Sequence, residues 1–327
     1  MKNKTAERNI VLETLRRIFF IPSKLPRTVQ IEVTNRCNLD CKMCPRRFLN
    51  IEYKDMDFEL FKMVIDKLEG VSEIILMGWG EPLIHPQIAE MIQYSHNAGF
   101  KTRLTSNAVL LNDKKIDEIA SAGLDEITLS IDSVHSSDFG HTMTSQIENI
   151  KNLANKFPLF PITLQTTIYK NKEEEVFDII KFAKQIKAKV NIGRLDIKFY
   201  DELERPNFQE EKSIVAKLIE FGDKQGVLVN CMYHSIDKEF KRFAYKLIKN
   251  FLHQKGKYCL RIYDYVYINF KGKVTPCCAL PLYEIGSLLK GDLKTIWQDK
   301  RNLRFRKNQK KICKKCDMFQ IKQCIDK

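Results

Sequence analysis

The feature that most constrains the fold of this 327-residue chain is a regular alternation of strand-like and helix-like segments between residues 28 and 192. Runs rich in β-branched and other apolar residues predict strands at residues 28–34, 73–77, 101–105, 126–131, 162–168 and 189–192. Apolar residues at helical spacing predict intervening helices at residues 58–68, 87–97, 113–122, 146–155 and 173–186. Two of these helices end at a glycine stop signal, Gly99 or Gly123. Successive βα units predict an α/β fold with a parallel sheet, either doubly wound or a partial (β/α)6 TIM-like barrel.

The alternation ends near Gly226, and the rest of the chain has a different character. Six of the ten cysteines lie at or beyond Cys259. We therefore expect an N-terminal helical arm (1–25), a barrel (26–235), a linking helix (236–255) and a small C-terminal domain (256–327). A segment of about 70 residues with few apolar periodicities would fold poorly on a hydrophobic core alone, so we expect this last domain to depend on a metal.

The charge and the cysteine content of the chain limit the cellular compartments and partners that it can have. Residues 1–9 are charged and the apolar run at 18–21 is too short for a secretory signal or a membrane span, which predicts a cytoplasmic protein. In that reducing compartment, ten cysteines favour metal or redox chemistry over disulfides. The formal net charge is +14, but the lysines are spread along the chain without an aromatic-interleaved basic motif. We therefore expect no specific nucleic-acid site and interpret most of the charge as solvated surface.

Three cysteines, Cys37, Cys41 and Cys44, directly follow the first predicted strand in the segment RCNLDCKMCP. Parallel α/β folds place their active sites at the carboxyl ends of the strands, so this loop is expected at the catalytic face. Four thiolates saturate a [4Fe–4S] cubane, whereas three leave one iron open to another ligand. A structural zinc site is the alternative, but it needs a fourth ligand, and the nearest histidine is His85.

Polar or glycine residues also follow the later predicted strands. The second strand is followed by Gly78-Trp79-Gly80-Glu81-Pro82, in which the glycines allow close backbone approach and Glu81 offers a carboxylate to an amine. The other positions are Ser106 and Asn107 after the third strand, Ser130 and Asp132 after the fourth, and Arg194 after the sixth. Each alone is compatible with an ordinary helix cap or turn. Together they predict one extended ligand that carries an amine, hydroxyls and a carboxylate.

The spacing Cys37-x3-Cys41-x2-Cys44 resembles the cluster motif of the radical S-adenosylmethionine (SAM) enzymes, and Gly78-x-Gly80-Glu81-Pro82 resembles their methionine-amine motif. The resemblance implies a partial six-unit βα barrel and a [4Fe–4S] cluster whose open iron is chelated by the amino and carboxylate groups of SAM. It also implies that one electron splits the sulfonium C–S bond, and that the 5′-deoxyadenosyl radical so formed removes a substrate hydrogen.

The same resemblance assigns the strand-end residues to the cofactor. Glu81, within Gly78–Pro82, is expected to contact the methionyl amine. Ribose or carboxylate contacts are expected from Ser106, Asn107, Ser130, Asp132 and Arg194. The third-strand motif reads Ser106-Asn107-Ala108, where many relatives have glycine after the asparagine. The expected electron donor is an acidic flavodoxin or ferredoxin that docks on the basic surface.

The C-terminal cysteines resemble a known extension of these enzymes. The pattern Cys259-x12-Gly272-x4-Cys277, followed by Cys278, Cys313-x2-Cys316 and Cys324, is similar to the SPASM/twitch domain that holds auxiliary [4Fe–4S] clusters. Its full seven-cysteine signature is not completed here, so the resemblance implies one auxiliary cluster. Its expected ligands are Cys259, Cys277, Cys313 and Cys316, with Cys278 and Cys324 as replacements. The bland alternative is a structural zinc knuckle built from the same cysteines.

Three functions follow from this interpretation. The first is oxidation of an alcohol carbon of a sugar or cyclitol, in which a fully ligated auxiliary cluster accepts the second electron. The second is a maturase that acts on a peptide or protein side chain. The third, from a different class, is a zinc-bearing nucleic-acid-binding protein that uses the basic charge. Iron and sulfide analysis separates this class from the first two, because two cubanes would bring roughly eight irons per chain.

Overall fold

The computed structural model describes residues 22–49, 51–135, 141–195, 204–231, 259, 261–313 and 316. The side chains of residues 141–143 and 208 lie outside this description. The expected linking helix at 236–255 and almost all of the expected N-terminal arm also fall outside it. Among the described helices, none is both long enough and apolar enough to cross a membrane.

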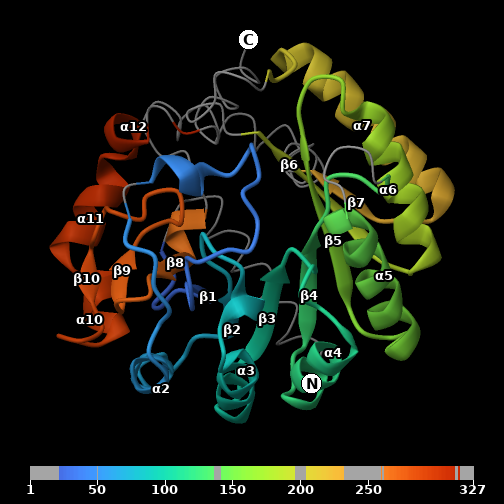
Figure 1. The fold of residues 1–327 in the computed structure, drawn as a ribbon. Helices are drawn as coiled ribbons and strands as arrows, with labels where there is room; N and C mark the ends of the chain where they lie inside the picture. The colour runs from blue at the N-terminus through green and yellow to red at the C-terminus, as the bar shows by residue number, and fades with distance from the viewer. Residues whose placement is uncertain are drawn as a thin grey trace, which may run out of the picture.

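Seven parallel strands form the barrel part of the sheet. They are β1 (Thr28–Ile31), β2 (Glu73–Leu76), β3 (Lys101–Ser106), β4 (Glu126–Ser130), β5 (Ile162–Ile168), β6 (Lys189–Arg194) and β7 (Val229–Cys231). Each strand pairs with the next along the chain, so the spatial order equals the sequence order. Helices lie on the outer side of this curved sheet (Figure 1). The predicted α/β barrel is confirmed, and β7 extends it beyond the six predicted units.

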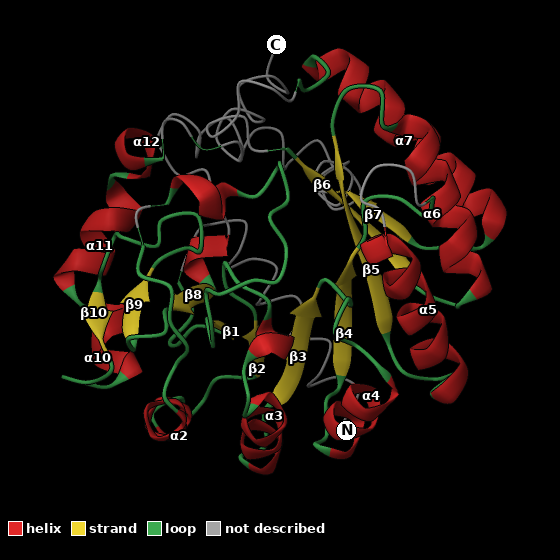
Figure 2. Ribbon diagram, viewed as in Figure 1, coloured by secondary structure: helices red, strands yellow, loops and turns green. Residues whose placement is uncertain are grey.

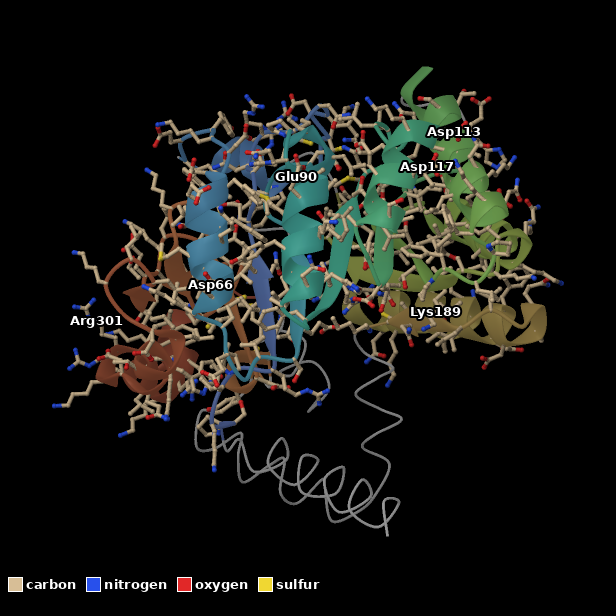
Figure 3. All side chains as sticks on the ribbon, turned by 90° about the horizontal axis from the view of Figure 1, so that it is seen from below. Asp66, Glu90, Asp113, Asp117, Lys189 and Arg301 are labelled. Carbon is tan, nitrogen blue, oxygen red and sulfur yellow. The ribbon has the colours of Figure 1, made fainter. Side chains whose placement is uncertain are left out.

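The outer helices are α2 (Phe58–Asp66), α3 (Ile88–Asn97), α4 (Asp113–Ser121), α5 (His141–Lys156), α6 (Glu173–Gln185) and α7 (Phe208–Gln225). Side-chain caps begin several of them, because unpaired N–H groups of a first turn need acceptors. Asp57 accepts from the N–H of Leu60 at α2, and Asn207 forms a capping box with Glu210 at α7. Figure 3 shows α2, α3 and α4 side by side, with the labelled Asp66, Glu90 and Asp117 on their outward side.

The two faces of the barrel sheet differ in chemistry. Residues that alternate along the strands, such as Ile31, Leu76 and Leu104, are fully buried and belong to one continuous apolar core. The other face is polar, and at the amino ends of the strands it carries a charged network. Arg103 lies 3.3 Å from a Glu73 carboxylate oxygen and 3.0 Å from one of Glu126. These ion pairs occupy the amino end of the barrel, so the carboxyl ends are left for a ligand.

The C-terminal region is built onto the same sheet. It contains η4 (Arg261–Tyr263), β8 (Tyr265–Ile268), β9 (Lys273–Thr275), β10 (Gly286–Ser287), α10 (Leu293–Gln298), α11 (Lys300–Lys307) and α12 (Gln309–Ile312). Strand β8 pairs in parallel with β1, and β9 and β10 follow antiparallel, which gives the order β10-β9-β8-β1-β2-β3-β4-β5-β6-β7. Figure 2 shows these strands continuing the sheet on the β1 side. The boundary predicted near residue 256 therefore does not divide the sheet.

Candidate functional site

The loop that carries Cys37, Cys41 and Cys44 leaves the carboxyl end of β1, as predicted. Its base is fixed by hydrogen bonds to the chain ahead of α2. Thr34 Oγ1 donates to Asp55 over 2.6 Å, and Asn35 Oδ1 accepts from the N–H of Lys54 over 2.7 Å. The Cys44 N–H donates to the Cys41 carbonyl, after which the short helix η1 (Pro45–Phe48) begins. All three thiols stay partly exposed.

The three thiols lie close enough to affect one another electrostatically. Burial, then Asp132 and the other two cysteines, raises the pKa of Cys41 to about 12. Burial also raises the pKa of Cys37, although the N–H of Leu39 points at its sulfur from 3.5 Å. Three thiolates beside a carboxylate need a positive partner, and iron supplies one. The donor set therefore fits a [4Fe–4S] cluster, although among the described residues no three Cys, His, Asp or Glu side chains already converge as metal ligands do.

The motif Gly78–Pro82 packs directly against the cysteine loop. A Cβ on Gly80 would lie 2.3 Å from the Arg36 carbonyl oxygen, and one on Gly78 would lie 2.4 Å from Cγ of Glu32. Both positions therefore require glycine, because real Cβ contacts are never so short. The N–H of Glu81 donates to the Arg36 carbonyl over 2.8 Å. Gly80 thus allows the contact between the two motif loops, and Gly78 makes room for the side chain of Glu32.

Glu81 is buried and bridges two strand ends. Its carboxylate accepts from the N–H of Leu83 over 3.0 Å, which caps the short helix η2 (Pro82–Ile84), and from the N–H of Asn107 over 2.6 Å. Burial raises the pKa of this carboxyl to about 6, against the lowering effect of these N–H groups and of Ser106. The side chain is only 2% exposed. Its visible role is to hold the β3 end against β2, and contact with a methionyl amine stays a prediction.

The ends of β3 and β4 are joined by a glutamine from α5. Gln146 Nε2 donates to the carbonyls of Asn107 and Ser130, over 2.5 and 2.8 Å. The Asn107 amide reaches the cysteine loop, where it donates to Asn38 Oδ1 over 2.9 Å. Ser106 Oγ accepts from the N–H of Ala108, whose φ of 61° is left-handed. Three predicted residues, Ser106, Asn107 and Ser130, are thus brought together near Cys37.

Lys172 is a functional candidate that the sequence did not reveal. It precedes α6 and is 2% exposed, and its Nζ donates to the Tyr169 hydroxyl over 3.1 Å. Its charge acts on Asp132, where burial raises the carboxyl pKa and Lys172 opposes that rise. The signal was hidden because Lys172 lies in the run Lys170-Asn171-Lys172-Glu173, which looks like a solvated helix start. Lys172 therefore acts electrostatically on Asp132, and Asp132 acts in turn on Cys41 of the cysteine loop.

Arg194 has a different environment from the other predicted residues. Its Nε donates to both carboxylate oxygens of Glu211 on α7, over 2.9 and 2.8 Å. The two side chains are 7% and 0% exposed. Arg194 therefore fastens α7 to the end of β6, since a buried ion pair of this geometry orients both partners. Its predicted contact with the cofactor carboxylate stays a prediction.

Two of the C-terminal cysteines pack against a small apolar cluster next to β8. Cys259 and Cys313 both pack against Ile262, Tyr263 and Phe305. Gln309 organises them: its Oε1 accepts from the N–H of Cys259 over 3.1 Å, and its Nε2 donates to the Tyr263 hydroxyl over 2.9 Å. The N–H of Cys316 donates to the Cys313 carbonyl over 2.8 Å. Cys324 lies outside the described residues.

Cys277 and Cys278 follow β9 and share a hydrogen bond. That bond, then the Arg261 guanidinium, the Tyr265 hydroxyl and the N–H of Ala279, lowers the pKa of Cys278 to about 5 against the effect of burial. The pKa of Cys277 is raised, first by the same hydrogen bond and then by burial. Thiolates are the form that binds iron, and both cysteines are candidate ligands. The assignment of Cys259, Cys277, Cys313 and Cys316 as the cluster ligands, with Cys278 as a replacement, stays a prediction.

A parallel βα barrel with three thiols after its first strand, and a second thiol group on the same sheet, defines an iron–sulfur-dependent enzyme class. Residues 31–192 match the family model of the radical SAM superfamily, and residues 259–317 match that of the SPASM iron–sulfur cluster-binding domain. The chain belongs to the radical SAM superfamily and carries a C-terminal SPASM domain. Its cofactors are accordingly SAM and a [4Fe–4S] cluster in the radical SAM domain, together with auxiliary iron–sulfur clusters in the SPASM domain.

Known relatives are diverse in activity. The chain is 33% identical over 131 residues to the tungsten-containing aldehyde ferredoxin oxidoreductase cofactor-modifying protein of Pyrococcus furiosus, which covers 38% of this chain and 37% of that protein. It is 22% identical to the AdoMet-dependent heme synthase of Methanosarcina barkeri, over 91% of this chain and 89% of that protein. Streptococcus suis SuiB bound to SAM superposes with a TM-score of 0.71 at 16% identity, over 91% of this chain and 72% of SuiB.

Proposed function

We propose that this radical SAM enzyme removes a hydrogen atom from its substrate and completes a net two-electron oxidation, with an auxiliary [4Fe–4S] cluster as electron acceptor. The observation that carries this proposal is the pairing of β8 with β1, the strand that leads into the cysteine loop. The SPASM thiols are thereby fastened to the strand that positions the first thiol group. Cleavage of bound SAM would supply the 5′-deoxyadenosyl radical.

The chain's own residues position this chemistry. Cys37, Cys41 and Cys44 would hold the first cluster, and the contacts of Glu81 and Gln146 keep the neighbouring strand ends in register with it. Such second-layer contacts orient metal ligands and cofactor sites. Lys172 is buried and acts electrostatically on Asp132, which itself acts on Cys41 of the same loop. We expect these two side chains to orient polar groups of the bound molecules.

For the substrate we propose a peptide or protein side chain. Large apolar side chains stand exposed around the cysteine loop: Phe48 at 55%, Tyr53 at 49% and Met77 at 36%. An apolar rim suits a peptide better than a polyol, because exposed aromatic residues contribute binding by burial. SuiB bound to its precursor peptide SuiA superposes over 97% of this chain with a TM-score of 0.70, which supports the same choice. Oxidation of a sugar or cyclitol, which the sequence analysis placed first, becomes the alternative in this proposal.

Deuterium transfer distinguishes the two substrate classes. The reconstituted enzyme would be given SAM, reductant and either a deuterated peptide pool or a deuterated sugar and cyclitol pool. If only the deuterated peptide pool labels 5′-deoxyadenosine, the proposed peptide substrate is supported. If only the sugar and cyclitol pool labels it, the proposed substrate class is wrong. A product two hydrogens poorer than the substrate supports the oxidation. Product formation that survives loss of the auxiliary thiols in a folded Cys259→Ala/Cys313→Ala protein would refute the acceptor role.

The basic surface of α10–α12 is our proposed docking site for an acidic flavodoxin or ferredoxin. Within the described residues no carboxylate pairs with its exposed cations, which are Lys294, Lys300, Arg301, Arg304, Lys307, Lys310 and Lys311. Leu303 is 42% exposed among them. Figure 3 shows Arg301 at the outer edge of the molecule, away from α2–α4. Helix α12 ends next to Cys313, so a carrier bound here would stand beside the SPASM thiols.

A further inference from the structure

Arg261 stands out among the C-terminal cations because it faces the SPASM thiols. It opens η4, and its guanidinium carbon lies 3.8 Å from the centre of the Tyr265 ring. The guanidinium is within electrostatic reach of the thiols of Cys278, Cys277 and Cys259. Across the described residues, no carboxylate lies within ion-pair distance of it. A cation held on an aromatic ring beside three thiols, with no carboxylate partner, is suited to an anionic group at those thiols.

The position of Arg261 is fixed by a glutamine of the barrel. Gln30 on β1 is 2% exposed, and its Oε1 accepts from Arg261 Nη2 over 3.3 Å and from the Tyr265 hydroxyl over 2.5 Å. Its Nε2 donates to the Met77 carbonyl over 2.9 Å. Both ends of the amide are therefore engaged, which fixes its orientation. Gln30 thus links the cation to Met77, the residue before the motif that begins at Gly78.

We propose that Arg261 is the counter-charge of the auxiliary cluster and a positioning residue for it. A thiolate-ligated cluster is anionic, and reduction adds one more negative charge. A fixed cation nearby stabilises the reduced form more than the oxidised form, so it raises the reduction potential. In the oxidation proposed above, the substrate radical loses one electron and one proton to become product. The electron would go to the auxiliary cluster when that cluster is bound, and Arg261 would offset the charge gained.

The catalytic importance of Arg261 rests on the proposed acceptor role of the auxiliary cluster. The effect of its charge on the reduction potential of that cluster can be measured without any substrate. The test uses the full chain, reconstituted anaerobically, in which Cys37, Cys41 and Cys44 are replaced by Ala so that only the auxiliary cluster gives a signal. Midpoint potentials are measured by EPR-monitored redox titration for this parent and for three variants of it, Arg261→Gln, Arg261→Lys and Arg301→Gln. Arg301 is the matched control, because it is, like Arg261, an exposed arginine of the same domain, but it lies on α11.

We expect Arg261→Gln to shift the midpoint potential of the auxiliary cluster to a more negative value than in the parent. Arg261→Lys should bring the potential most of the way back to the parent value, and Arg301→Gln should leave it unchanged. Equal potentials for Arg261→Gln and the parent would overturn the inference. Iron content is measured in parallel. Loss of the cluster in Arg261→Gln but not in Arg261→Lys supports it, whereas loss in both shows that the shape of the guanidinium and not its charge matters, which refutes it. None of these outcomes depends on the substrate assay.

Discussion

Replacing Glu81 with glutamine should remove a pH-dependent penalty on the folded protein. Burial is the main cause that raises the pKa of the Glu81 carboxyl from 4.5 to about 6. A carboxyl pKa that is higher in the folded state means that folding favours the protonated form. The contribution of this group to stability is therefore complete below its unfolded value of 4.5 and is lost as the pH rises through about 6.

The size of the effect follows from the two pKa values. Their separation, from 4.5 to about 6, is about 1.5 units, which corresponds to about 2 kcal/mol at about 1.4 kcal/mol per unit. About 1 kcal/mol of this change falls between pH 5 and 7.5. Glutamine does not ionise, so the free energy of unfolding of the wild-type protein should fall by that amount relative to the Glu81→Gln protein over this range. The other groups titrate alike in both proteins and cancel.

The measurement is anaerobic urea unfolding followed by tryptophan fluorescence, at several pH values, for wild type and Glu81→Gln. Glu118→Gln is the control, because the hydrogen bond from Lys115 lowers the pKa of the Glu118 carboxyl. Its stability difference from wild type should stay nearly constant from pH 5 to 7.5, and wild type should lose its advantage only as the pH falls below 4.5. If the stability curves of wild type and Glu81→Gln stay parallel from pH 5 to 7.5, the assignment of a buried, penalised carboxylate at this position is wrong.

Three further changes test the site. Gly80→Ala should destabilise the folded protein by about 1–3 kcal/mol and lower the iron bound by the first thiol loop, because its Cβ would lie 2.3 Å from the Arg36 carbonyl; iron analysis and thermal unfolding check this. Gln309→Leu should selectively weaken auxiliary-cluster retention, since it removes the acceptor of the Cys259 N–H; iron per chain and EPR would show a loss confined to that cluster. Charge reversal on α11, in the variant Lys300→Glu/Arg304→Glu/Lys307→Glu, should slow electron transfer from an acidic flavodoxin and weaken the salt dependence of its rate. The matched reversal on α7, Lys212→Glu/Lys217→Glu/Lys224→Glu, should change neither. Stopped-flow measurement of cluster reduction compares the two variants.

The elements that the sequence predicted are those with a strong local period. All six predicted strands are present, and β5 has the bounds that were expected, because β-branched runs between turn residues give a local signal. Helix α5 begins at His141 rather than near residue 146. Helix α7 was not predicted, although Asn207 and Glu210 form a capping box and Gly226 ends it in a left-handed conformation. The three-residue β7 is too short for any period to show.

The sequence predicts the site residues whose type alone indicates a chemical role, such as the cysteines, and does not predict the residues that position them. Cysteine spacing placed the thiols, because few other roles explain three cysteines after a strand. Gln30, Gln146 and Lys172 could not be found in this way. A glutamine in a strand or helix has no local signature, and its role depends on which carbonyls the fold brings within reach. Each of these three residues acts between elements that are distant in the sequence.

In the C-terminal region, the local pattern of apolar residues does not reveal that some of them belong to the core of the barrel. Few apolar periodicities led to the expectation that this region depends on a metal to fold. In the structure every residue of β8 is buried, and Val266 and Ile268 belong to the same apolar core as β1. Trp297 of α10 is 1% exposed and donates from its indole to the Ser23 carbonyl over 2.8 Å. The region therefore takes its stability from the barrel's core as well as its own, because β8 pairs with β1 and shares its apolar core. We therefore expect metal binding to stabilise the segments that carry the thiols, where the apolar cluster is small, and we expect the strands that attach them to β1 to fold without it.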